Sequence, residues 1–308
     1  MTQSIKQVAL GNYHAALLTK HGQVYTWGWG DLGQLGHGET GNLSEPKQVK
    51  LMSVLQIACG TKFTVALTLY GELYSWGDND QGQLGIGSTT KQFTPTRIKK
   101  ITDVKNVACG STYVMAVCEM TNMLNQSQYK LDSSTVWTWG TENANGKIKT
   151  LPWEMVGLRN LGIHKISCGL FHTLAMNRLG QVYEWKLGEN PAMLGGYIQG
   201  HYVRSIACGS FHSIALSHSG KVFTWGRNKD SQLGRSLNAQ DLTKPNLADI
   251  SVKPDDSSKK VPVPFVTHVS AGEFHTMAIV DEDPRRLILW QFLKVERMYQ
   301  VKLKVIVE

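Results

Sequence analysis

The chain has 308 residues, and its 32 Lys and Arg outnumber its 24 Asp and Glu, which gives a formal net charge of +8 at pH 7. A hydrophobic content of 42% with only 18% charged residues excludes a disordered chain and predicts a stable core. No stretch of about 18 apolar residues occurs, so no membrane span is expected. The odd number of cysteines, five, and an N-terminus unlike a signal peptide predict reduced thiols and an intracellular protein.

From residue 5 onward the chain repeats a unit of about 50 residues, and this predicts one repeat domain over residues 1–308. The six visible units start near residues 5, 54, 104, 163, 203 and 266. Each unit has one anchor glycine: Gly11, Gly60, Gly110, Gly169, Gly209 and Gly272. In four units a second glycine follows eleven residues later, and a tryptophan comes five residues after that. The tryptophans at this repeat position are Trp27, Trp76, Trp139, Trp185 and Trp225, with Trp290 displaced in unit six.

Each unit is typical of four short β-strands. The segments after the anchor glycine are rich in β-branched and aromatic residues, and the second glycine suits a tight hairpin turn that needs positive φ. After the tryptophan, a second turn reads Gly-Gln-Leu-Gly in units one and two and Ser-Gln-Leu-Gly in unit five. A Pro-x-x-aliphatic segment closes several units, as at residues 46–49 and 95–98. Four strands per unit of this size predict an all-β protein, a β-propeller.

Three segments break the repeat. Residues 119–134 are an insertion in unit three, and residues 235–264 are a long charged stretch in unit five. The third segment, residues 141–148, follows Trp139-Gly140 where the Gly-Gln-Leu-Gly turn is expected. Because specificity in repeat scaffolds comes from loops and insertions, these segments are the expected places for function.

Residues 300–308 form a further expected strand, because apolar residues mostly alternate with lysines there. Unit one begins directly on its first strand, so we expect it to lack an outer strand. The C-terminal strand could supply that strand and close a six-bladed ring, which would hide two sheet edges. The alternative is an open or seven-place ring with an incomplete blade, whose edge a partner strand fills.

The conspicuous histidines and cysteines are interpreted as structural. His14, His172, His212 and His275 share one repeat position, which Phe63 and Tyr113 occupy in the other two units. A position that accepts Phe or Tyr is a packing position with an optional hydrogen bond. Four cysteines likewise share the position before the anchor glycine, and no close Cys pair of the kind that binds zinc occurs. The tryptophans are expected to pack between blades, and neither a metal nor a cofactor is predicted.

Signatures of catalysis are also missing from the sequence. Gly28-Trp29-Gly30 belongs to the turn repeat and opens no helix, so it is not a phosphate-binding loop. No nucleophile elbow and no recurring pair of carboxylates is found. Hydrolytic, redox and group-transfer chemistry therefore lack support, and binding is the expected activity.

These motifs together resemble the regulator of chromosome condensation repeat family. The resemblance rests on the apolar-Ala-Cys-Gly start, the histidine three residues later, the Trp-Gly pair and the Gly-Gln-Leu-Gly turn, and it covers residues 5 to about 290. It implies a β-propeller, usually of seven blades, whereas six units are visible here. It also implies one of two functions.

The first function is a non-catalytic scaffold that binds protein partners through loops on the disc faces, as family members do in ciliary, centrosomal, mitochondrial and ubiquitin-ligase settings. The second is a guanine nucleotide exchange factor for a Ran-type small GTPase, or a secreted bacterial effector that mimics one in the host cytosol. The family's exchange factor carries a projecting wedge in an Asn-Gly-containing stretch after a Trp-Gly pair. The matching wedge candidate here is Thr141, Glu142, Asn143, Ala144, Asn145, Gly146 and Lys147.

Two features weaken the exchange hypothesis and the prospect of chromatin binding. Ser111 stands where the exchange factor has an acidic residue after the anchor glycine, and the acid appears instead as Glu273 in unit six. The basic N-terminal arm that family members use on chromatin has no counterpart, so nucleic acid is not an expected partner.

Overall fold

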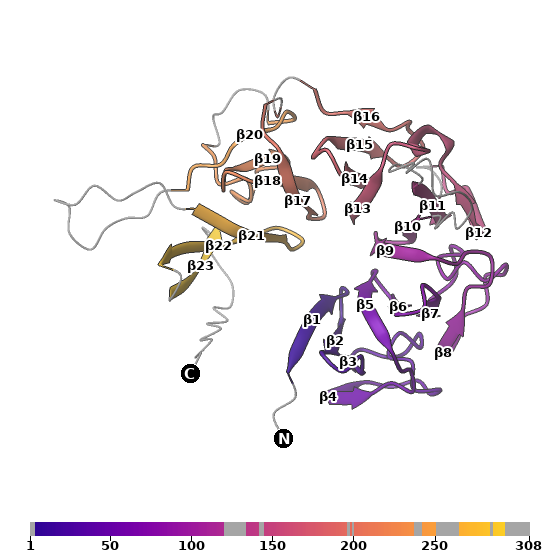
Figure 1. Ribbon diagram of the computed structural model, residues 1–308. Helices are drawn as coiled ribbons and strands as arrows, with labels where there is room; N and C mark the ends of the chain where they lie inside the picture. Colours follow the sequence, from indigo (N-terminus) through magenta and orange to yellow (C-terminus); the bar gives the residue numbers. More distant parts are fainter. Residues whose placement is uncertain are drawn as a thin grey trace, which may run out of the picture.

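In the computed structural model, residues 4–119, 134–141, 145–195, 198, 200–236, 242–250, 265–283 and 286–292 are described, the backbone alone for residues 281–292. They form six antiparallel sheets, or blades, arranged as an arc around a central axis, with strands β1, β5, β9, β13, β17 and β21 nearest that axis (Figure 1). The predicted all-β propeller with six repeat units is thereby confirmed.

Blades 1 to 3 have four strands each. Blade 1 consists of β1 (Ile5–Leu10), β2 (His14–Thr19), β3 (Val24–Gly28) and β4 (Leu43–Gln48). Blade 2 consists of β5 (Val54–Cys59), β6 (Phe63–Thr68), β7 (Leu73–Gly77) and β8 (Gln92–Arg97). Blade 3 consists of β9 (Val104–Cys109), β10 (Tyr113–Glu119), β11 (Ser134–Thr141) and β12 (Ile148–Glu154), and the 3-10 helix η1 (Val156–Leu158) follows it.

Blades 4 and 5 also have four strands, whereas the described part of blade 6 has three. Blade 4 consists of β13 (Ile163–Cys168), β14 (His172–Asn177), β15 (Val182–Lys186) and β16 (Ala192–Met193). Blade 5 consists of β17 (Val203–Cys208), β18 (His212–Ser217), β19 (Val222–Gly226) and β20 (Asn246–Leu247). Blade 6 consists of β21 (Phe265–Ala271), β22 (Thr276–Asp283) and β23 (Arg286–Phe292).

Blade 1 corrects one expectation from the sequence. Its four strands follow one another in the sheet in chain order, and β4 is its outer strand. The prediction that unit one lacks an outer strand was therefore wrong, because the Pro-containing segment at the end of the unit pairs with β3 of the same blade. Blade 1 therefore has no missing outer strand for residues 300–308 to supply. These residues lie outside the described residues, so any other role of this segment in closing the ring stays a prediction.

The two insertions differ in their relation to the blades. Residues 119–134 connect β10 to β11, and residues 120–133 of this insertion lie outside the described residues. The stretch 235–264 contains β20, the outer strand of blade 5, which pairs with β19 through Phe223↔Leu247. This stretch is therefore partly a blade strand and not only an interruption of the repeat.

Each blade packs against the next through its own apolar cluster. In the first such interface, Leu18 and Val24 of blade 1 meet Ile57 and Trp76 of blade 2, all fully or almost fully buried. Equivalent clusters join blades 2 to 3, 3 to 4, 4 to 5 and 5 to 6. The anchor glycines allow this close approach, since a Cβ on Gly11 would lie 2.7 Å from the carbonyl oxygen of Gly60 in the next blade.

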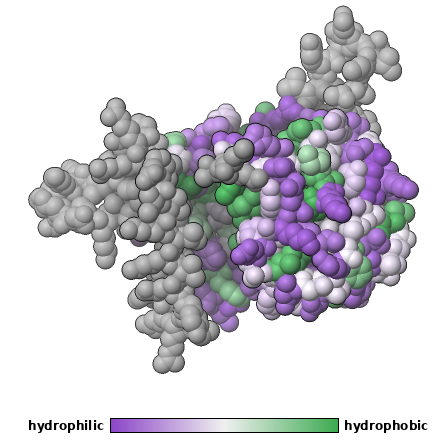
Figure 2. Space-filling model, turned by 90° about the horizontal axis from the view of Figure 1, so that it is seen from below, coloured by the Kyte–Doolittle hydropathy of each residue, from purple (hydrophilic) through white to green (hydrophobic). Residues whose placement is uncertain are grey.

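Blade 1 has one face that no described blade covers. Val8 is 51% exposed, whereas Val107 at the same repeat position in blade 3 is 2% exposed. Ile5 and Leu10 beside Val8 are also exposed. Figure 1 shows the reason, because the arc is open between blade 6 and blade 1. Apolar surface lies on this side of the molecule, next to the residues drawn in grey (Figure 2).

The two valines at one repeat position provide a matched test of this packing. We expect Val107→Ala to lower the free energy of unfolding by about 2 kcal/mol, because it leaves a cavity between blades 2 and 3. Val8→Ala should change it by about 0.5 kcal/mol or less, since little is buried there. Urea unfolding of both variants measures the difference. Equal losses would contradict an open blade 1 face and would indicate that another segment covers Val8.

Candidate functional site

One face of the disc carries a rim of aromatic residues. The turns between the first and second strand of each blade lie on this face, together with the loops that follow the Trp-Gly pairs. The residue before the repeat histidine is aromatic in four blades. These residues are Tyr13, Phe171, Phe211 and Phe274, and each is between 38% and 66% exposed. We call these four residues and Trp29 the aromatic rim.

Stacking contacts order this rim. The ring of Tyr13 meets Trp29 edge-on with centroids 6.0 Å apart, and Lys62 Nζ of the next blade lies 5.7 Å from the centre of Trp29. In blade 5, the guanidinium of Arg227 lies 5.6 Å from the ring centre of Phe211 and 5.2 Å from that of Phe274 in blade 6. Cation–π contacts of this kind are favourable and hold the rings in place.

Trp29 and Arg227 occupy the same repeat position, two residues after the repeat tryptophan. The backbone N–H at this position donates to the carbonyl of the residue before the repeat histidine. Trp29 donates to Tyr13 over 2.8 Å, and Arg227 donates to Phe211 over 2.9 Å. The fold therefore places the side chain at this position beside the rim residue of its own blade.

The repeat histidines lie just beneath the rim and connect neighbouring blades. His14 Nε2 lies 2.9 Å from Thr64 Oγ1 of blade 2, and His212 Nε2 lies 3.0 Å from Thr276 Oγ1 of blade 6. Tyr113 makes the equivalent contact, 3.0 Å, with Thr173 Oγ1. These contacts support the interpretation of the position as packing with a hydrogen bond. Burial lowers the pKa of His14, His172 and His212 to about 4.

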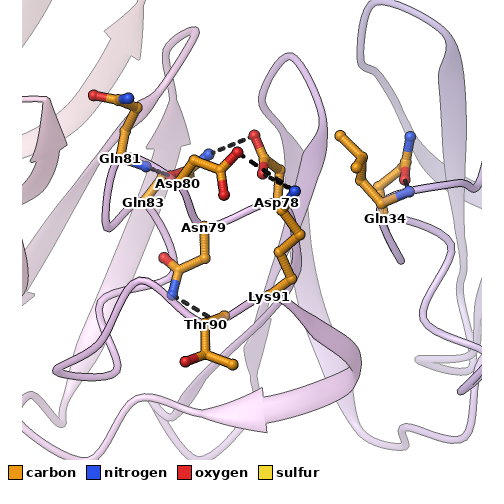
Figure 3. A network of polar contacts seen from close by, with 9 residues as sticks. Gln34, Asp78, Asn79, Asp80, Gln81, Gln83, Thr90 and Lys91 are labelled. Carbon is orange, nitrogen blue, oxygen red and sulfur yellow. Dashed lines mark hydrogen bonds and ion pairs between the residues drawn. The ribbon is translucent and has the colours of Figure 1, made fainter.

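The turn after the Trp-Gly pair lies on the same face, is held by side-chain hydrogen bonds and buries its leucine. In blade 2, Asn79 Oδ1 accepts from the Leu84 N–H over 2.9 Å, and Asn79 Nδ2 donates to the carbonyls of Ser88 and Thr90. Figure 3 shows the contact between Asn79 and Thr90. Lys91 Nζ lies 3.6 Å from an oxygen of Asp78 and 3.4 Å from one of Asp80. The leucines of the three turns, Leu35, Leu84 and Leu233, are all buried.

The glutamine of this turn links its blade to the next through its backbone carbonyl. Trp76 Nε1 and Thr64 Oγ1 of blade 2 both donate to the carbonyl oxygen of Gln34 in blade 1, each over 2.9 Å. Trp139 Nε1 of blade 3 donates to the carbonyl of Gln83, again over 2.9 Å. Thr276 Oγ1 of blade 6 donates to the carbonyl of Gln232 over 2.7 Å. One carbonyl therefore satisfies buried donors of the following blade, which otherwise lose water without compensation.

Blade 4 lacks this turn, and the carboxylate of Glu184 replaces the turn carbonyl as the hydrogen-bond acceptor for blade 5. The Oε1 atom of Glu184 accepts from Trp225 Nε1 over 2.8 Å and from Ser213 Oγ over 3.2 Å. These are the blade 5 counterparts of Trp76 and Thr64. Burial is the largest influence on Glu184 and raises the pKa of its carboxyl group.

The sequence itself marks Glu184 as unusual at its repeat position. The residue before the repeat tryptophan is Thr26, Ser75, Thr138 and Thr224 in blades 1, 2, 3 and 5. Thr26, Ser75 and Thr224 donate to the leucine carbonyl of the turn in their own blade. A glutamate at this position, in a unit without the turn, is the exception that could have identified the substitution.

Hollows remain where blades 3 and 4 lack the turn. A pocket of about 300 Å³ at blade 3 is lined by residues that include Trp139, Thr141 and Trp185. A pocket of about 520 Å³ at blade 4 is lined by residues that include Phe171, Glu184 and Phe211. In blades 1 and 2 this space is taken, because the last glycine of the turn lies against the indole of the next blade. A Cβ on Gly36 would be 2.7 Å from Trp76 Nε1.

The wedge candidate lies on the same face, in the connection between β11 and β12. Thr141 pairs with Ile148 at its base, and Thr141 Oγ1 lies 2.8 Å from Thr112 Oγ1. Asn145, Gly146 and Lys147 are exposed, whereas Glu142, Asn143 and Ala144 lie outside the described residues. Ser111 lies in the turn between β9 and β10, and its Oγ donates to the carbonyl of Leu170 in blade 4 over 2.8 Å.

Burial raises the pKa of the Cys59 and Cys168 thiols to about 12, so these thiols stay protonated at neutral pH. Among the described residues, no group of three or more His, Cys, Asp or Glu could hold a metal ion. In the same part of the chain, no helix is long and apolar enough to cross a membrane.

The sequence matches a family of known repeats. The family described as "Regulator of chromosome condensation (RCC1) repeat" matches residues 21–67, 70–117 and 219–279, and a second model with the same description matches residues 5–34, 54–83 and 203–232.

Two curated relatives are much longer than this chain. Ras guanine nucleotide exchange factor C of Dictyostelium discoideum is 31% identical over a region that covers 98% of this chain and 23% of that protein. The human E3 ubiquitin-protein ligase HERC2 is 34% identical over 61% of this chain and 4% of that protein. The chain thus spans a quarter or less of the length of these relatives.

Two solved structures have a similar fold. Human WBSCR16 superposes with a TM-score of 0.70 at 23% identity, covering 90% of this chain and 72% of that one. Prp20p of Saccharomyces cerevisiae, whose structure was described with its binding properties to Gsp1p and histones, gives a TM-score of 0.70 at 20% identity over 89% of this chain and 68% of that one. These likenesses show the propeller fold.

The buried histidines predict a loss of stability in acid. A histidine whose pKa is lower in the folded than in the unfolded state stabilises the fold fully above pH 6.5, and this stabilisation is lost as the pH falls towards 4. Each such group contributes about 1.4 kcal/mol per pH unit in that window. We expect His14→Phe, a side chain that blade 2 carries at this position, to remove one group's share of the slope. Urea unfolding at several pH values measures it, and an unchanged slope would contradict this assignment.

Proposed function

The chain belongs to the regulator of chromosome condensation repeat family, and we propose that it acts as a non-catalytic scaffold that binds protein partners through the face carrying the aromatic rim. The observation that carries this proposal is the rim itself. Four exposed aromatic side chains recur at one repeat position around the central axis, on a rigid framework. Aromatic residues and arginine are the types most enriched at the energetic centres of protein interfaces.

The chemistry of the described side chains also favours binding over catalysis. His14, His172 and His212 are neutral at physiological pH, because burial lowers their pKa to about 4. His14 and His212 each contact a threonine of the next blade. The thiols are held in their unreactive protonated form by burial. These groups stabilise the contacts between blades, and the loops above them remain available to a partner.

Protein partners are favoured over nucleic acid. The net charge of +8 is mild for a chain of 308 residues and does not by itself call for a nucleic acid partner. Relatives carry names that involve proteins as targets, namely a Ras exchange factor and a ubiquitin ligase. The location of the protein inside the cell stays a prediction from its unpaired cysteines.

An exchange factor for a Ran-type or related small GTPase is the second candidate function. It is favoured by the relative named Ras guanine nucleotide exchange factor C, which aligns with 98% of this chain, and by residues 145–147 of the wedge candidate, which are exposed. The matched region is 23% of that relative, and Ser111 does not reproduce the acidic residue of the family's exchange factor. For these reasons the scaffold is placed first.

Partner capture with matched variants tests the scaffold function. The double variant Phe171→Ala/Phe211→Ala removes two rim residues, and Tyr70→Ala/Tyr202→Ala removes two exposed tyrosines that lie outside the rim. We expect the rim variant to lose at least tenfold of the affinity for a captured partner, because interface aromatics contribute about 2 kcal/mol or more each. The tyrosine variant should bind like the wild type. Equal binding by both variants, with unchanged melting temperatures, would contradict binding through the rim.

Release of a fluorescent guanine nucleotide tests the alternative. Ran and several related GTPases are mixed with catalytic amounts of the protein, and of the triple variant in which Asn143, Asn145 and Gly146 are changed to alanine. Acceleration by the wild type that the triple variant lacks would establish an exchange factor with a wedge at residues 141–148. Spontaneous release rates with every GTPase would exclude this activity for the GTPases tested.

A further inference from the structure

The hollow at blade 4 has in its wall a carboxylate, that of Glu184, which takes the place of the missing turn carbonyl. The pocket of about 520 Å³ lies between blades 4 and 5, in the space that the missing turn leaves open. Phe171 of blade 4 and Phe211 of blade 5 are among its lining residues and are exposed at the rim. Deeper in, the pocket is lined by Glu184, with Trp185 and Trp225 beside it.

Glu184 carries a negative charge into this space. Its Oε1 atom accepts the two hydrogen bonds from blade 5 that a backbone carbonyl accepts elsewhere in the ring. A carbonyl oxygen would satisfy those two donors without a charge. The carboxylate adds a second oxygen and a negative charge in a partly buried place, which raises the pKa of the group through desolvation. A cation bound in the pocket would offset that cost.

The protein itself shows which cation fits between two rim phenylalanines. In the next gap along the ring, between blades 5 and 6, the guanidinium of Arg227 lies over Phe211 and Phe274. In blade 4 the same repeat position holds Leu187, whose N–H donates to the Phe171 carbonyl over 2.9 Å. The gap between Phe171 and Phe211 therefore has the two rings but no cation from its own chain at that position.

We propose that this pocket binds an arginine side chain of a protein partner, with the guanidinium between Phe171 and Phe211 and paired with Glu184. Arginine suits the site because its planar group stacks on aromatic rings and can form two parallel hydrogen bonds with a carboxylate. The proposal rests on the scaffold function, since it names the group of the partner that the rim face recognises.

The other titratable groups that line the pocket also affect the binding of a cation. Glu189 lies in its wall and favours a bound cation, whereas Lys186 opposes one. His172 also lines the pocket, and burial lowers its pKa to about 4, so it is neutral at physiological pH and adds no repulsion. Removal of the lysine charge in Lys186→Ala should therefore strengthen arginine binding.

Two small probes test the proposal without knowledge of the partner. N-acetyl-arginine N-methylamide carries the guanidinium, and the citrulline analogue has nearly the same shape without the charge. The indole signals of Trp185 and Trp225, which line the pocket, report binding in NMR titrations of the full chain. We expect saturable shifts with the arginine probe and about tenfold weaker binding of the citrulline probe, because charge-assisted hydrogen bonds are roughly twice as strong as neutral ones.

Variants then test whether the preference for the charged probe depends on the carboxylate of Glu184. Glu184→Gln keeps an acceptor for Ser213 and Trp225 but removes the charge, and it should weaken the arginine probe about tenfold. The matched control is Glu154→Gln, which changes a glutamate paired with Arg159 on the outer strand of blade 3. Absence of saturable shifts in the wild type, or equal binding of the two probes, would overturn the proposal. Either result would leave rim-dependent capture of a partner unaffected, so a failure here is distinguishable from a failure of the scaffold function.

Discussion

The contact between neighbouring blades depends on one hydrogen-bond acceptor oxygen. A blade presents a backbone carbonyl from its Gly-Gln-Leu-Gly turn, and the next blade directs a buried indole N–H or threonine hydroxyl at it. Buried donors without a partner are costly, so this oxygen constrains how neighbouring sheets align, together with apolar packing. The anchor glycines bring the blades close enough for these short contacts to form.

The same constraint explains why hollows lie at blades 3 and 4, where we propose that a partner binds. Loss of the turn removes both its buried leucine and its backbone carbonyl acceptor. The first loss opens a hollow, and the second leaves the buried donors of the next blade without their usual partner. In blade 4 the Glu184 carboxylate restores the acceptor but does not refill the space. The result is a concave, partly charged site between exposed aromatic residues, within a framework that is otherwise regular.

The repeat spacing predicted most of the fold, since the anchor glycines and tryptophans recur at fixed offsets. Turn glycines such as Gly22 and Gly71 do adopt positive φ, at 77° and 76°. The outer strand of blade 1 was missed, although the Pro-x-x-aliphatic segment at residues 46–49 marks it, because a long loop separates this segment from β3, with which it pairs. Glu184 is the exception at its repeat position in the sequence, but its role belongs to the contact between blades 4 and 5, which the structure alone shows. Aromatic residues of the rim were visible, but their gathering on one face requires the ring.

The central claim is that Glu184 replaces the turn carbonyl of blade 4, and hydrogen exchange of the tryptophan indole N–H groups tests it most directly. The variant Glu184→Leu removes the acceptor and leaves the turns of blades 1 and 2 intact. We expect the Trp225 indole to exchange at least tenfold faster in this variant, since its hydrogen bond is lost, with Trp76 and Trp139 unchanged. Unchanged protection of Trp225 would contradict the claim, because its N–H would then depend on some other acceptor.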